Sequence, residues 1–162
     1  MKYAIIFNTK SGITEDCANE IKKGLKGEGD IINLSKKNKV NLDNYSLIVI
    51  GTPIYAGQIN RKIKKLCIKN EEILRNKEIA FYTCGLSKDE DAYNYLIKSI
   101  PINLKEKAII ISHFGGELRP NKLRFPFNII AKKIMQNSNE TYKINKDNID
   151  KYINGINTIK IV

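Results

Sequence analysis

The chain has 162 residues, three cysteines and a formal net charge of +11 at pH 7. Its length fits one domain with a substantial core, and three distant cysteines without a C-x-x-C pair indicate a reducing compartment and argue against a zinc site. No apolar run approaches the roughly 18 residues of a membrane-spanning helix, and the five apolar residues after Met1-Lys2 are too few for a signal peptide. We therefore expect a cytoplasmic protein without a metal site.

Short apolar runs alternate with segments of helical periodicity along the whole chain. The runs predict strands over residues 2–7, 30–34, 47–51, 78–83 and 108–112. They are rich in Ile and Val and lack polar alternation, which is typical of parallel strands buried on both faces. Apolar residues at helical spacing follow each run. This alternation predicts a doubly wound α/β sheet, with helices on both faces, in a single domain over residues 1–162.

The first turn, residues 8–15, joins the first predicted strand to the first predicted helix. Thr9, Ser11 and Thr14 place three hydroxyl groups around Gly12. Backbone N–H groups and the dipole at a helix N-terminus attract an anion, and a glycine lets the backbone come close to it. The turn therefore predicts a phosphate site, although an ordinary Ser/Thr helix cap is the alternative. Neither the P-loop pattern nor the Rossmann pattern of glycines occurs.

The turns after the third and fourth predicted strands, residues 52–57 and 83–89, are expected to lie beside the first turn. Ligands of open parallel sheets bind beyond the carboxyl ends of the strands, where these turns meet. Tyr55 adds an aromatic ring, so the three turns predict a site for a phosphorylated cofactor with a flat ring. Cys84 is expected to be a small buried residue, and His113, the only histidine, to cap the fifth strand.

Positive charge gathers in two segments. Residues 44–70 and 118–139 each carry five basic side chains and no acidic one. Such a field favours anionic partners, namely nucleic acid, an acidic lipid surface, or an acidic protein or ligand, while plain solubilising lysines are the alternative explanation. Nucleic acid is not expected, because no surface that combines aromatic and basic residues for base stacking is evident.

Taken together, the three turns resemble those of the flavodoxin family. Residues 9–14 match its T-x-[ST]-G-x-T phosphate loop, residues 51–55 match the loop that places an aromatic residue on one face of the flavin, and residues 83–85 match the loop on the other side. The resemblance implies FMN as the cofactor and a flavodoxin-like, five-stranded parallel sheet of order 2-1-3-4-5. It also implies the flavin-binding residues Thr9, Lys10, Ser11, Gly12, Ile13, Thr14, Thr52, Pro53, Ile54, Tyr55, Ala56, Gly57, Thr83, Cys84, Gly85 and Leu86.

Within that family the chain is most similar to the flavodoxin-domain group of the menaquinone-dependent protoporphyrinogen IX dehydrogenase. The similarity lies in the loop at residues 51–57 and in a basic, extended stretch at residues 115–127 that leads into an apolar and basic helix. Because porphyrinogen carries carboxylates, the candidate substrate contacts are Arg119, Lys122 and Arg124. Lys132 and Lys133 flank the apolar face of the following helix, which is interpreted either as ordinary core or as a membrane-surface helix.

Two functions follow from the resemblance. One is an FMN-dependent oxidoreductase that passes electrons from a small organic substrate, with porphyrinogen as the candidate, to a quinone. The alternative is a non-enzymatic electron shuttle, whose partner would have to be an acidic redox protein because the chain is strongly basic. The alternative to a free cytoplasmic location is a peripheral position on the inner face of the membrane, through the basic segments.

Overall fold

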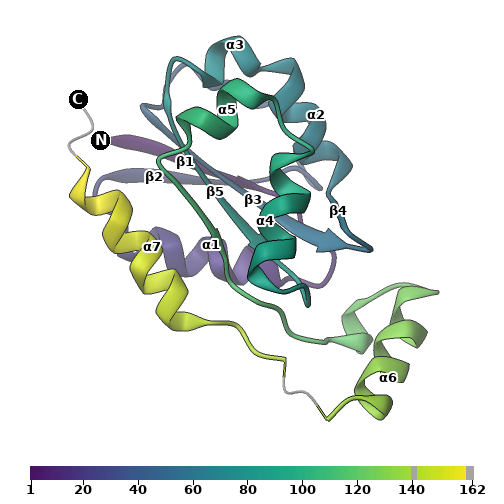
Figure 1. Ribbon diagram of the computed structural model, residues 1–162. Helices are drawn as coiled ribbons and strands as arrows, with labels where there is room; N and C mark the ends of the chain where they lie inside the picture. Colours follow the sequence, from purple (N-terminus) through teal and green to yellow (C-terminus); the bar gives the residue numbers. More distant parts are fainter. Residues whose placement is uncertain (140–141, 160–162) are drawn as a thin grey trace.

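Figure 1 shows the computed structural model, which describes residues 1–139 and 142–159. Five parallel strands form a sheet of order β2-β1-β3-β5-β6. The order agrees with the predicted 2-1-3-4-5 once the short strand β4, which pairs with β3 beside the main path, is left out of the numbering. The strands are β1 (Lys2–Phe7), β2 (Glu28–Asn33), β3 (Leu47–Tyr55), β4 (Gln58–Ile59), β5 (Glu78–Cys84) and β6 (Ile110–His113).

Helices cover both faces of the sheet, as the alternation predicted (Figure 1). One face packs against α1 (Ile13–Gly24) and α7 (Lys146–Thr158). The other packs against α2 (Arg61–Lys69), α3 (Glu71–Leu74), α4 (Asp89–Ile97) and α5 (Ile102–Lys107). Successive strand residues point to opposite faces, so Ile5 enters the first core and Ile6 the second. Burial on both faces explains why the strands are continuously apolar.

The third strand continues four residues beyond its predicted end and turns back as β4. Tyr55 pairs with Gln58 in an antiparallel hairpin. The two residues between them, Ala56 and Gly57, have φ angles of +47° and +71°. Two central residues with positive φ are the mark of the type I′ turn that suits the twist of a hairpin. Residues 52–55, predicted as part of a loop, are therefore strand.

Residues 118–139, between β6 and α7, lie outside the two helical layers. They contain the short helix η1 (Pro120–Lys122) and α6 (Phe127–Asn137). Figure 1 shows α6 beyond the carboxyl end of the sheet, apart from the helices that cover its faces. Among the named elements of the described chain, α6 packs extensively only on η1. No helix in residues 1–139 or 142–159 is long and apolar enough to span a bilayer.

Candidate functional site

A cavity of about 360 Å³ lies where the turns after β1, β3 and β5 meet. One part of its lining, here called the strand-end wall, comes from these turns and from the last residues of β3 and β5: Ser11, Ile13, Thr14, Pro53, Ile54, Tyr55, Ala56, Cys84, Gly85, Leu86 and Ser87. The other part comes from residues 116–137, here called the cover segment: Gly116, Glu117, Leu118, Leu123, Phe127, Ile130, Ala131 and Ile134. The lining is mostly apolar, with hydroxyl groups near the start of α1.

Helix α1 begins at the edge of this cavity. Gly12 precedes it with a φ of +88°, in the left-handed region that favours glycine, and its N–H donates to Thr9 Oγ1 at 2.9 Å. The first helical hydrogen bond runs from the Asp16 N–H to the Gly12 carbonyl. The N–H groups of Ile13 and Thr14, which line the cavity, are therefore not used by the helix. They form the positive end of a helix dipole beside a hydroxyl group.

Two aromatic side chains, Tyr55 and Phe127, lie at the cavity beside the ammonium group of Lys10. The ring centroids of Tyr55 and Phe127 lie 6.3 Å apart, with 52° between the ring planes. Lys10 Nζ lies 4.7 Å from the Tyr55 centroid and 4.4 Å from the Phe127 centroid. Both distances are within the range of a cation–π interaction. Burial raises the pKa of Tyr55, a hydrogen bond with Ser11 opposes this, and the phenol remains neutral near pH 7.

Cys84 ends β5 with a buried thiol at the cavity. Its S–H donates to Cys17 Sγ on α1, with 3.7 Å between the sulfur atoms. This hydrogen bond, together with burial, raises the pKa of Cys84 well above its usual value. Because the thiolate is the reactive form of cysteine, a thiol held in its protonated state is a poor nucleophile. The geometry is consistent with the expected role of Cys84 as a small buried residue.

Arg119 attaches the cover segment to α1. Its Nη1 atom lies 2.7 Å from Asp16 Oδ2, and its Nη2 atom lies 2.6 Å from Glu117 Oε2. The two carboxylates compensate the positive charge of Arg119. Lys122 and Arg124 are exposed and do not line the cavity. Substrate contact by these three residues remains a prediction.

Ten of the sixteen residues predicted to bind the cofactor line the cavity, all of them in the strand-end wall. The other six lie beside it: Thr9, Lys10, Gly12, Thr52, Gly57 and Thr83. Thr52 is fully buried and its Oγ1 accepts a hydrogen bond from the Asn60 N–H at 3.0 Å, so it braces the β3–β4 hairpin. Gly57 lies in the turn of that hairpin.

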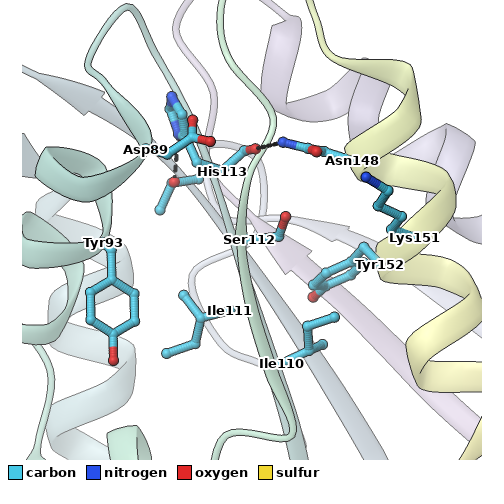
Figure 2. Close-up of a pocket in the computed structure, with 10 residues that line it drawn as sticks. Asp89, Tyr93, Ile110, Ile111, Ser112, His113, Asn148, Lys151 and Tyr152 are labelled. Atoms are coloured by element: carbon cyan, nitrogen blue, oxygen red, sulfur yellow. Dashed lines mark hydrogen bonds between the residues drawn. The ribbon is translucent and has the colours of Figure 1, made fainter.

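Thr83 faces a second cavity, of about 300 Å³, which runs along the edge strand β6 (Figure 2). Asp89 of α4 lies on one side of this strand and Asn148 of α7 on the other. Thr83 Oγ1 is 2.8 Å from His113 Nδ1, and Asn148 Nδ2 donates to the His113 carbonyl at 3.0 Å. Burial lowers the pKa of His113, opposed by the Asp89 charge and nearby backbone carbonyls. The contact between Thr83 and His113 thus joins the end of β5 to the end of β6.

Sequence reasoning missed the lining that comes from the cover segment. The signal was present, because Phe127, Ile130, Ala131 and Ile134 follow helical spacing. That spacing was compatible with an ordinary core face. In the described α6 only Ala131 is buried, and the other three side chains border the cavity. Periodicity identifies the apolar face of a helix but does not reveal what that face covers.

Comparisons with known proteins agree with this architecture. Residues 4–145 match the family described as Flavodoxin domain. The protoporphyrinogen IX dehydrogenase [quinone] of Escherichia coli (strain K12) is 25% identical over 146 residues, covering 85% of this chain and 81% of that protein. A flavodoxin of Clostridium saccharobutylicum is 34% identical over 76 residues, covering 44% of this chain and 48% of its own.

Similarity to solved structures extends over almost the whole fold. The crystal structure of Fusobacterium nucleatum flavodoxin bound to flavin mononucleotide superposes with a TM-score of 0.52 and 16% identity, covering 96% of each chain. At this identity the likeness concerns the fold alone. The family match, by contrast, spans most of the sequence and includes the turns after β1, β3 and β5. The chain therefore belongs to the flavodoxin domain family.

Proposed function

We propose that this protein binds FMN in the cavity between the strand-end wall and the cover segment and works as an oxidoreductase. The observation that carries the proposal is the joint placement of an open helix N-terminus and an aromatic residue on one cavity. A helix N-terminus binds phosphate, and an aromatic side chain stacks on a flat ring. When bound, FMN supplies the electron chemistry.

The residues at the start of α1 fit a phosphate group. The N–H groups of Ile13 and Thr14 and the hydroxyl groups of Ser11 and Thr14 are the donors for its oxygen atoms. Asp16, in the first turn of α1, would repel a phosphate, but Arg119 lies 2.7 Å from its carboxylate and compensates this charge. Arg119 thus assists phosphate binding from the cover segment, because its Nη1 atom lies beside Gly12.

Tyr55 and Phe127 fit the flat ring. Tyr55 lies on the strand-end wall and is held as a neutral phenol, while Phe127 brings a second aromatic ring from α6. The backbone from Ile54 to Ala56 and from Cys84 to Leu86 lines the same cavity and supplies N–H and C=O groups for the polar edge of the ring. The apolar side chains of the cover segment exclude water from this region.

For the reaction, we propose oxidation of an organic substrate with a quinone as electron acceptor. The support is the 25% identity, over most of both chains, with an enzyme named protoporphyrinogen IX dehydrogenase [quinone]. Porphyrinogen is accordingly the first substrate to assay, with menaquinone as acceptor. Quinones are lipid-soluble, so we also propose that a basic segment of this protein contacts the membrane surface.

An electron carrier is the second candidate function, because the chain is also 34% identical to part of a flavodoxin. The net charge of +11 restricts such a carrier to acidic protein partners. Steady turnover of porphyrinogen with menaquinone in the absence of any other protein favours the enzyme. FMN binding without such turnover, together with electron transfer to an acidic redox protein, favours the carrier.

FMN binding is tested with Ser11→Glu, which places a carboxylate beside the phosphate donors. We expect FMN affinity to fall at least about 100-fold, since like charges about 4 Å apart near a protein surface repel by a few kcal/mol. The matched control is Ser35→Glu, the same substitution at an exposed serine outside the cavity. Fluorescence titration of the apoprotein with FMN measures both. Equal affinities in the two variants would falsify the phosphate assignment.

A further inference from the structure

The cover segment exposes apolar and basic side chains together. Five of the eleven large apolar side chains exposed in the described part of the chain lie within residues 125–135. The most exposed of these is Phe125, at 77%, two residues before the start of α6. Residues 118–139 contain five basic side chains and no acidic one. A monomeric protein rarely gathers exposed apolar groups in this way unless the surface has a partner.

Helix α6 presents two different faces. Phe127, Ile130 and Ile134 border the cavity. Ile129, Lys132 and Lys133 follow the spacing i, i+3, i+4 and share the opposite face, because successive residues turn by about 100° around a helix. Here these three residues are called the outer face of α6, and all three are exposed. The outer face therefore has no part in lining the cavity and is available to a partner.

Most cations of this surface have no acidic partner among the described residues. Lys122, Arg124, Lys132 and Lys133 are exposed, and none forms an ion pair within residues 1–139 and 142–159. Arg119 differs, because two carboxylates hold it. Free cations beside exposed apolar groups match a surface that is anionic at its headgroups and apolar just beneath them. An acidic protein would pair with these cations, but it would not explain the exposed aromatic side chain of Phe125.

We propose that Phe125 and the outer face of α6 dock on the surface of an anionic phospholipid bilayer. Lys132 and Lys133 lie among the headgroups, while Phe125 and Ile129 reach the boundary of the acyl chains. The contact is interfacial, because no described helix can cross a bilayer. The cavity face of α6 stays turned toward the strand-end wall, so docking leaves the lining of the cavity unchanged. The inference rests on the membrane contact in the proposed function, and vesicle binding is measured without turnover.

The first experiment reverses charge on two basic helices. The purified FMN-loaded protein is sedimented with vesicles of mixed phosphatidylcholine and phosphatidylglycerol and with vesicles of phosphatidylcholine alone. Lys132→Glu/Lys133→Glu is compared with Lys64→Glu/Lys65→Glu on α2, which changes the net charge equally at exposed lysines of a second basic helix. We expect the α6 variant to lose at least about 25-fold in partitioning to the mixed vesicles, from about fivefold per cation, and the α2 variant to change far less.

The second experiment removes apolar area. Phe125→Ser/Ile129→Ser is compared with Ile68→Ser on α2, another exposed isoleucine beside a lysine. Only the first variant is expected to weaken vesicle binding, because only its side chains belong to the docking surface. FMN titration of every variant is run in parallel, so that loss of the cofactor is distinguished from loss of docking.

Three outcomes overturn the proposal. Wild-type protein that stays in solution with mixed vesicles has no such docking surface. Equal losses in the α6 and α2 charge variants mean that net charge alone drives binding. Unchanged vesicle binding in Phe125→Ser/Ile129→Ser removes the apolar part of the surface. A protein that fails to bind FMN but still binds vesicles through α6 refutes the cofactor proposal and leaves the docking surface in place.

Discussion

The strand-end wall and the cover segment line the same cavity but are held in different ways. The wall rests on the central strands, where Ile5 is fully buried, and the buried Tyr82 hydroxyl donates to the Thr14 carbonyl at 2.8 Å. The cover segment rests on the buried side chain of Ala131, on the ion pair of Arg119 with Asp16, and on the contacts of Phe127 with Tyr55 and Lys10. The shape of the wall is thus fixed by the core, whereas the cover depends on contacts at the rim of the cavity.

This difference predicts unequal costs for one substitution at two isoleucines. Ile5→Ala, in the core under the wall, should lower the free energy of unfolding by about 2–5 kcal/mol, because it removes buried methyl groups and leaves a cavity. Ile130→Ala, on α6, should cost less than about 1 kcal/mol, because Ile130 is 49% exposed. Urea denaturation monitored by circular dichroism measures both. Equal costs would show that α6 is packed as firmly as the sheet.

The same contrast applies to the two aromatic residues of the cavity. Tyr55→Ala should weaken FMN binding by about 2 kcal/mol, or about 30-fold, through lost stacking and burial against a fixed surface. Phe127→Ala should cost only a few-fold, because α6 can adjust and Lys10 remains beside Tyr55. Titration of each apoprotein with FMN gives the two affinities. A larger loss for Phe127→Ala would make the cover segment, not the wall, the main holder of the ring.

The sequence predicts the strand-end wall but not the cavity lining from the cover segment, and the reason is physical. The order of strands and the meeting of the turns at Ser11, Tyr55 and Cys84 follow from buried apolar runs and from the rule that parallel strands end together. The β3–β4 hairpin was missed because Thr52-Pro53 suggests a turn, whereas the positive φ angles fall at residues 56 and 57. The roles of Arg119 and Phe127 depend on contacts with residues about 100 and 70 positions away, which periodicity does not encode.

The smallest predicted effect concerns His113, which joins the ends of β5 and β6. Burial lowers its pKa in the folded protein, although Asp89 and the carbonyl groups of residues 83, 85 and 87 oppose this. The unfolded chain, with a histidine pKa of about 6.5, therefore binds more protons than the folded protein below neutral pH. Stability is fully present above that value and is lost as the pH falls through it. The slope from this one group is at most about 1.4 kcal/mol per pH unit.

We expect His113→Gln to flatten the fall in unfolding free energy between pH 7.5 and pH 5.5, measured by urea denaturation at several pH values. The slopes are compared, not the absolute stabilities, because the substitution also alters the 2.8 Å contact with Thr83. Lys151→Gln, on the other side of β6, is the matched control, because Lys151 borders the same cavity and the substitution introduces the same residue there. Identical slopes in wild type and His113→Gln would mean that His113 binds a proton equally well in the folded and the unfolded protein, which would contradict this prediction.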